Sequence, residues 1–290
     1  MGEAEVRALF GRPEPVFADL SRWWKFGLFG SGTSTWLNDI VTNGVDELRP
    51  YETRRTLLLD RTGRIRADFH VFVMPDESLL VVQDPVQPRP AADILAPYVL
   101  SADVTITDRT TDLGLICHPR TGWTMVEAWS PGVLENGFDQ LIPAGQVGER
   151  RKEMGARLEA SEQDLEVWRI LRGQPRFGVD VGEDALPSEA GLDYLVDTSK
   201  GCFLGQESVA KVRNLGHPPR LVLPFHAGGQ VYPMALIHAD GEEVGRVTSV
   251  VPFDDGEGTA CIGRIRWEAR EAHLTTDRGV LLRVRSDHTP

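Results

Sequence analysis

The chain has 290 residues, a formal net charge of −12, 41% apolar residues and 26% charged residues. This composition is typical of a globular protein with a substantial core and two or three subdomains. So acidic a chain is a poor generic nucleic-acid binder, and no apolar run of about 18 residues predicts a transmembrane helix. The N-terminus lacks the basic start and apolar stretch of a signal peptide, so we expect a cytoplasmic protein without direct nucleic-acid or membrane partners.

The first part of the chain mixes short helices with strands. Helical spacing of apolar residues predicts a helix in Ser34–Leu48 that ends at Asn43-Gly44. Two strands are predicted in residues 53–74, around a turn at Asp60–Gly63. Further elements in chain order are a strand at 78–83, a helix at 91–99 and a strand at 102–108.

The second of the two paired strands alternates strongly. Ile65, Ala67, Phe69, Val71 and Val73 form an apolar face. On the polar face, Asp68 lies beside Arg66 and His70. The same hairpin carries five arginines within thirteen residues, Arg54, Arg55, Arg61, Arg64 and Arg66. These arginines are either a solvated face or a site for an anionic ligand, because guanidinium groups bind carboxylates with two hydrogen bonds.

The middle of the chain continues the mixture. Strands are predicted at 113–119 and 122–129, and helices at 148–160 and 161–175. Because strands and helices occur without regular βαβ alternation, the predicted class is α+β.

The pattern of predicted elements changes near His217. From there short strands alternate with glycine turns, which is typical of a small β-barrel or sandwich. The predicted domains are therefore an N-terminal α+β lobe at 1–110, a second α+β lobe at 111–216 and a small β-barrel at 217–290.

The three cysteines have different surroundings. Cys117 and Cys261 lie in apolar, strand-like runs, so we expect both to be buried. Cys202 lies in the polar, glycine-rich stretch SKGCFLGQESVAK. No CxxC pair or Cys/His cluster has metal-ligand spacing, so no metal site is predicted.

Cys202 precedes a predicted helix, whose N-terminal dipole favours a thiolate. Lys200 lies two residues upstream and adds positive charge. The alternative interpretation is a structural loop with Phe203 in the core. No histidine is close in sequence, which disfavours a Cys/His hydrolase.

Several segments together resemble one known family. The motif KGCFLGQE resembles the signature of the YgfZ family of folate-binding proteins, relatives of the glycine-cleavage T-protein, an aminomethyltransferase. The segments WLNDIVTNGVDEL, LLLDRTGRIRADFHVF, WRILRGQPRFGVDVGEDALPSEAGLDYLV and GEEVGRVTSV resemble other family segments in the same order. The resemblance spans about Gly30 to Gly263.

The resemblance implies two α+β lobes and a small β-barrel around a central hole that holds tetrahydrofolate. It places Asp68 and Val82 beside the pterin; the other interpretation of Asp68 is a carboxylate paired with a neighbouring Arg or His. The candidate partners of the folate tail are Arg66, Arg169, Arg176 and Arg213. Lys200 is expected to hold the thiolate or the folate tail, and Gln206 and Glu207 to fix the loop.

Three residues depart from the transferase pattern. The transferases have an acid where Cys202 stands, a second acid where Ala67 stands, and a pterin-binding glutamate where Leu171 stands. The resemblance therefore favours folate binding without one-carbon transfer.

By this reading, the chain is a folate-binding accessory protein for assembly or repair of iron–sulfur enzymes, including one that modifies tRNA. Folate and iron–sulfur client proteins are its expected partners, and Cys202, Lys200 and Asp68 its expected reactive residues. One alternative is a tetrahydrofolate-dependent aminomethyl or methyl transferase or demethylase. Another is a non-enzymatic interaction module on the same scaffold.

Overall fold

The computed structural model describes the chain except residues 13, 15, 120–132, 135–136, 156–157 and 286–290. The predicted strand at 122–129 lies outside the described residues. The chain forms two compact units. One comprises Met1–Ala8, Glu162–Tyr194 and Glu207–Pro290, and the other Leu9–Ser161 with Leu195–Gln206. These units do not follow the three predicted domains, and that division stays a prediction.

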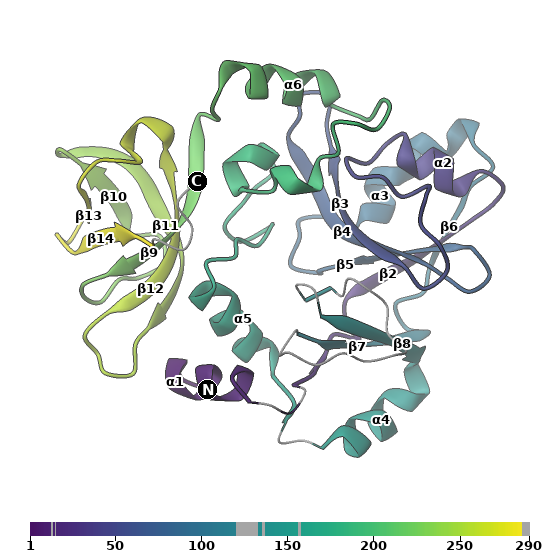
Figure 1. Ribbon diagram of the computed structural model, residues 1–290, viewed down its shortest axis with the longest axis horizontal. Helices are drawn as coiled ribbons and strands as arrows, with labels where there is room; N and C mark the ends of the chain where they lie inside the picture. The colour runs from purple at the N-terminus through teal and green to yellow at the C-terminus, as the bar shows by residue number, and fades with distance from the viewer. Residues whose placement is uncertain (13, 15, 120–132, 135–136, 156–157, 286–290) are drawn as a thin grey trace. The chain divides into compact units, whose positions relative to one another are not determined.

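The unit Leu9–Ser161 with Leu195–Gln206 contains a five-stranded antiparallel sheet in the order β3-β4-β5-β2-β6 (Figure 1). Its strands are β2 (Trp24–Phe29), β3 (Thr53–Leu59), β4 (Ile65–Val73), β5 (Leu79–Gln83) and β6 (Thr105–Asp108). Helices α2 (Thr33–Asn38) and α3 (Ala91–Leu95) contribute to the apolar core on one face, and α3 continues as a 3-10 helix over Ala96–Ser101. The predicted alternation of β4 is confirmed, since Ala67, Phe69, Val71 and Val73 all lie in this core.

One expectation for this sheet needs correction. Helix α2 ends at Asn38 rather than at Asn43-Gly44, because the chain turns there so that Val41 bridges to Leu58 of β3. On the polar face of β4, Asp68 and His70 are buried, with 7% and 8% exposure. Period-2 patterning shows which residues share a face, but not whether another layer of the protein covers that face.

A smaller sheet in the same unit has the order β1-β7-β8. Its strands are β1 (Ala18–Asp19), β7 (Leu113–His118) and β8 (Phe138–Pro143). A 3-10 turn (Ala144–Gln146) leads into helix α4 (Val147–Met154), where Gly155 with φ of 88° follows the last turn. Cys117 on β7 is buried, as the sequence predicts.

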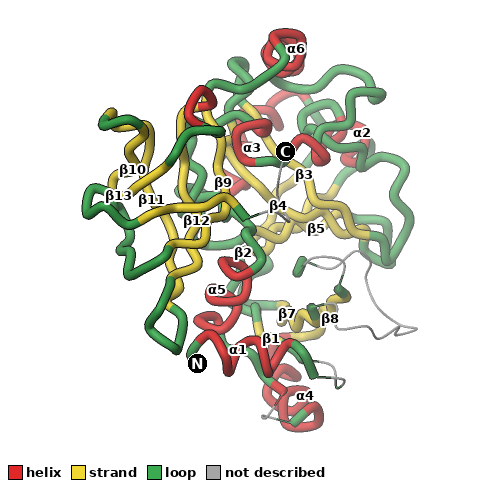
Figure 2. Tube along the Cα trace, turned by 60° about the vertical axis from the view of Figure 1, so that its left-hand side comes forward, coloured by secondary structure: helices red, strands yellow, loops and turns green. Residues whose placement is uncertain are grey.

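The second unit contains a closed barrel in the order β10-β11-β12-β9-β14-β13 (Figure 2). The strands are β9 (Arg220–Ala227), β10 (Leu236–Ala239), β11 (Glu242–Pro252), β12 (Thr259–Arg266), β13 (Leu274–Thr276) and β14 (Leu281–Val284). Its interior is apolar and includes Phe225, Ile237, Val247 and Cys261. The predicted class, α+β with a small C-terminal β-barrel, is confirmed.

The helices assigned to this unit, in whole or in large part, are α1 (Glu3–Phe10), α5 (Glu162–Leu171) and α6 (Gln206–Leu215). Short 3-10 helices occur at Pro187–Ala190, Asp193–Leu195 and Trp267–Ala269. The sequence predicts strands at 221–229, 241–252, 259–267 and 279–285, which match β9, β11, β12 and β14, but it does not predict β10 and β13.

Candidate functional site

Asp68 lies on β4 just beyond the point where β5 stops pairing with it at Phe69 and Gln83. Here the buried side chain of Gln87 takes the place of a neighbouring strand as the hydrogen-bonding partner of the Asp68 backbone. Its Oε1 accepts the Asp68 backbone N–H at 3.0 Å, and its Nε2 donates to the Asp68 carbonyl at 2.5 Å. The Gln83 side chain donates to the same Oε1 at 2.8 Å. The backbone of Asp68 is therefore fixed by a chain of amides, which satisfies groups that are costly to bury unpaired.

The carboxylate of Asp68 is bound by Arg55 of β3. Nε donates to Oδ1 at 2.9 Å and Nη2 donates to Oδ2 at 2.6 Å. Such a two-pronged contact between a guanidinium and a carboxylate is a strong, orienting pair. Asp68 is therefore paired with an arginine of the neighbouring strand, as one of its two interpretations expects, while its place beside a pterin stays a prediction.

His70 and Val82 lie on the same face of the sheet as Asp68. His70 is in register with Arg55 on β3 and with Val82 on β5. Burial, and secondarily the nearby Arg55 charge, lowers the pKa of His70 to about 3, against an opposing effect of Asp68. This face thus combines an arginine–carboxylate pair with a neutral imidazole that can donate and accept hydrogen bonds.

The loop that carries Cys202 is anchored on both sides of the cysteine. Phe203 is 7% exposed, and Leu204 packs against the core of the five-stranded sheet. Gly205, with φ of 83°, passes so close to the β3–β4 turn that a Cβ there would lie 2.3 Å from the Asp60 carbonyl oxygen. Cys202 itself is exposed. The loop thus presents the thiol to solvent while its neighbours are held.

Lys200 does not lie where the sequence suggests. Its ammonium donates to the carbonyl oxygens of Asn38 at 2.5 Å, Val41 at 2.7 Å and Asn43 at 3.3 Å, and to Asn38 Oδ1 at 3.2 Å. Burial is the main cause that lowers the pKa of Lys200 from its ordinary value. Its charge is thus used by the turn after α2, rather than by the thiolate or a folate tail as expected.

Three further predicted residues, Gln206, Glu207 and Arg213, lie on helix α6. Gln206 begins the helix, and its backbone N–H donates to the Phe203 carbonyl at 3.3 Å. Glu207 and Arg213 are exposed, and the Arg213 charge partly offsets the burial that raises the pKa of Asp193. Asp68, Val82, Lys200, Cys202 and Gln206 belong to one compact unit, and Arg169, Glu207 and Arg213 to the other.

Comparisons with known proteins show what the chain is similar to in sequence and in fold. No protein-family model matches the chain. A candidate chloroplastic transferase of Arabidopsis thaliana is 22% identical, covering 91% of this chain and 68% of that protein. The aminomethyltransferase of Frankia alni is 24% identical, over 80% of this chain and 72% of that protein. The crystal structure of glycine cleavage system aminomethyltransferase T from Bartonella henselae matches 98% of this chain and 88% of that chain, with a TM-score of 0.81 and 16% identity.

The chain has the aminomethyltransferase fold. Its relation to the glycine-cleavage T-protein family is supported by both sequence and structure. On this fold, two of the three departures have clear positions. Ala67 lies in the core of the five-stranded sheet, on the opposite face from Asp68, and Leu171 is buried at the last turn of α5.

Arg169 is part of a hydrogen-bonded network within its own unit of the aminomethyltransferase fold. Its guanidinium donates to both carboxylate oxygens of Glu166, at 2.7 and 2.5 Å. It also donates to Asp180 Oδ2 at 2.6 Å and to Ser249 Oγ at 2.9 Å. With 8% exposure and these partners, Arg169 has a structural role, which disfavours the expected contact with a folate tail.

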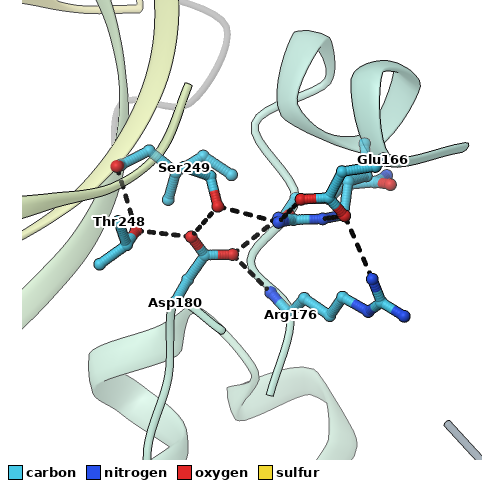
Figure 3. Close-up of polar contacts among 8 residues, drawn as sticks. Glu166, Arg176, Asp180, Thr248 and Ser249 are labelled. Carbon is cyan, nitrogen blue, oxygen red and sulfur yellow. Dashed lines mark hydrogen bonds and ion pairs between the residues drawn. The ribbon is translucent and has the colours of Figure 1, made fainter. Parts of the chain in front are cut away.

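Asp180 is the centre of this network. Its Oδ1 accepts hydrogen bonds from Thr248 at 2.5 Å and Ser249 at 2.6 Å, both on β11 (Figure 3). Its Oδ2 also accepts the Arg176 backbone N–H at 3.0 Å, while the Arg176 side chain donates to Glu166 at 3.2 Å. The network therefore joins α5 to the barrel wall.

Sequence reasoning missed the residues that support Asp68. Arg55 was noted only as one of five hairpin arginines, and its pairing depends on strand register. Gln83 and Gln87 carry no motif signal. In the described part of the chain, no group of three His, Cys, Asp or Glu side chains could hold a metal ion. No helix there is long and apolar enough to cross a membrane.

Proposed function

We propose that this chain binds tetrahydrofolate and is a YgfZ-type accessory protein, rather than a one-carbon transferase. The observation that carries the proposal is the two-pronged contact of Arg55 with Asp68. The contact orients the Asp68 carboxylate on the sheet face that also carries His70 and Val82. A carboxylate held in this way has oxygens that can accept an N–H group of a pterin.

The exposed thiol of Cys202 is the second part of the proposal. The accessory role is support for the assembly or repair of iron–sulfur client enzymes in the cytoplasm, including one that modifies tRNA. This role rests on the resemblance of the KGCFLGQE motif. One cysteine does not supply the four thiolates that clusters usually need, so a cluster would be shared with the client or pass through.

Anaerobic titration with tetrahydrofolate, followed by calorimetry, tests the folate part. We expect saturable binding to the wild-type chain and to Cys202→Ser. Asp68→Asn should bind at least about tenfold more weakly, because a charged acceptor is lost. No saturable binding by a folded wild-type chain would contradict the proposal and favour the interaction-module alternative.

Reconstitution of a purified iron–sulfur apoenzyme tests the accessory part. The wild-type chain should speed the recovery of cluster absorbance and client activity, and Cys202→Ser should not. Lys152→Ala, a change at an exposed site on α4, is the matched control. An equal effect of wild type and Cys202→Ser would overturn the role of the thiol.

A folate-dependent aminomethyl or methyl transferase is the second candidate, favoured by the names of the relatives. An assay for methylene-tetrahydrofolate formation from aminomethyl or methylated donors separates the two. Turnover that survives Cys202→Ala and is lost in Asp68→Asn would favour the transferase.

A further inference from the structure

The turn after α2 forms a cage of oxygens. The last carbonyls of a helix lack intrahelical partners. Here the carbonyls of Asn38, Val41 and Asn43, with the Asn38 side-chain oxygen, converge on one point at 2.5–3.3 Å from the Lys200 nitrogen. All four oxygens are neutral, and three of them belong to the backbone.

Other hydrogen bonds fix the cage independently of Lys200. Asn38 Oδ1 accepts the Val45 N–H at 3.0 Å. The Asn43 N–H donates to Thr56 Oγ1 at 2.9 Å, and its side chain donates to the Arg55 carbonyl at 3.2 Å. The cage oxygens are thus held by β3 and by the turn itself, which is the preorganisation that a binding site requires.

The approach of the Lys200 segment is also fixed. The Thr42 hydroxyl donates to the Leu195 carbonyl at 2.7 Å, and the Asp197 N–H donates to the Thr42 carbonyl at 3.0 Å. The Asp197 carboxylate in turn accepts the N–H of Ser199 at 2.8 Å. Two contacts with Thr42 therefore precede the one made by the lysine side chain.

Rings of backbone carbonyls that replace a hydration shell are the donor set of potassium sites. An ammonium group carries the same charge and makes N–H···O bonds over a similar distance. We propose that the turn after α2 is a monovalent-cation site that the chain fills with its own Lys200 ammonium, which makes Lys200 the positioning residue of the Cys202 loop. The inference does not depend on folate binding.

Lys200 lies two residues before Cys202, so the occupancy of the cation site affects the cysteine loop. Lys200 and Phe203 are the two anchors nearest to the exposed thiol, one on each side. If the ammonium leaves the cage, the segment before Cys202 loses its four hydrogen bonds with the turn after α2. The site thus controls how the thiol is presented without touching it.

Cation rescue of Lys200→Ala tests this inference. The readouts are the thermal midpoint and the rate of Cys202 alkylation, each measured in chlorides of potassium, ammonium, sodium and tetramethylammonium at equal ionic strength. Potassium and ammonium should raise the midpoint of Lys200→Ala and return its alkylation rate toward that of wild type. Sodium and tetramethylammonium should do neither, and wild type and Lys152→Ala should not distinguish the four cations. Equal responses of all variants to all four cations would overturn the inference.

A measurement on the wild-type chain covers the case in which Lys200→Ala does not fold. Acylation with an N-hydroxysuccinimide ester, read by mass spectrometry, compares the lysines with one another. Lys200 should react at least about tenfold more slowly than the exposed Lys152 and Lys211, because it must leave the cage first. Fully buried Lys25 is the internal standard for protection. A Lys200 rate equal to that of Lys152 would contradict the cage.

Discussion

Arg55 and Asp68 lie diagonally across β3 and β4 and are joined by hydrogen bonds of 2.9 and 2.6 Å. Removing one partner of a buried pair leaves the other charge uncompensated. We expect Arg55→Met to lower the free energy of unfolding by about 1–3 kcal/mol, a reduced value because the Arg55 side chain is 30% exposed. Urea unfolding measures this, and the double variant with Asp68→Leu should recover part of the loss. An unchanged midpoint in Arg55→Met would show that the pair contributes nothing.

One thiol should react in the native chain and three after unfolding. Cys202 is exposed, whereas Cys117 and Cys261 are buried in their strands. A chromogenic disulfide reagent should modify one thiol rapidly. The other two should react at least about a hundredfold more slowly, because each needs local opening. Cys202→Ser should abolish the fast phase, and a fast phase that persists in this variant would contradict the assignment.

Acid should destabilise the chain through His70. The pKa of His70 is lowered to about 3 in the folded state, so the unfolded state binds more protons between pH 6.5 and 3. The contribution of His70 to stability is therefore complete above pH 6.5 and is lost as the pH falls through this window. We expect a loss of roughly 2–4 kcal/mol that is absent in His70→Gln. The check is the difference in unfolding free energy between the two proteins, and a difference that does not change with pH would refute it.

Asp139 should change the pH dependence of stability in the direction opposite to His70. Burial raises its pKa to about 7, against smaller effects of the Cys117 thiol and the Val133 N–H. The folded state then binds more protons than the unfolded state between pH 3.8 and 7, so stability falls as the pH rises through that range. Asp139→Asn, which keeps an acceptor for Val133, should gain roughly 2–4 kcal/mol relative to wild type between pH 4 and 8. Unfolding curves at several pH values test this. Free energies of unfolding of wild type and Asp139→Asn that change with pH in parallel would exclude it.

Local patterning predicted much of the fold. The alternation of β4 identified its core face, because residues two apart share a face whatever the tertiary context. The glycine-spaced strands after His217 predicted the barrel. Strands β10 and β13, of four and three residues, were missed, although β6 and β14 are also only four residues long.

The contacts of the candidate site were less predictable. Lys200 is two residues from Cys202 in sequence, but the direction of its side chain is set by the turn after α2, which lies about 160 residues earlier. Arg55 meets Asp68 because of strand register, and Gln87 pairs with the Asp68 backbone because β5 ends early. Pairings of this kind depend on where strands start and stop, which is the least certain part of a sequence-based prediction.

Asn43 belongs to two arrangements at once. Its carbonyl accepts the Lys200 ammonium, and its side chain donates to the backbone of Arg55, the residue that binds Asp68. A fluctuation that frees Asn43 releases both partners together. The amides of the cysteine loop and of the first half of β3 should therefore share one opening free energy in native-state hydrogen exchange, as a single cooperative unit of the molecule.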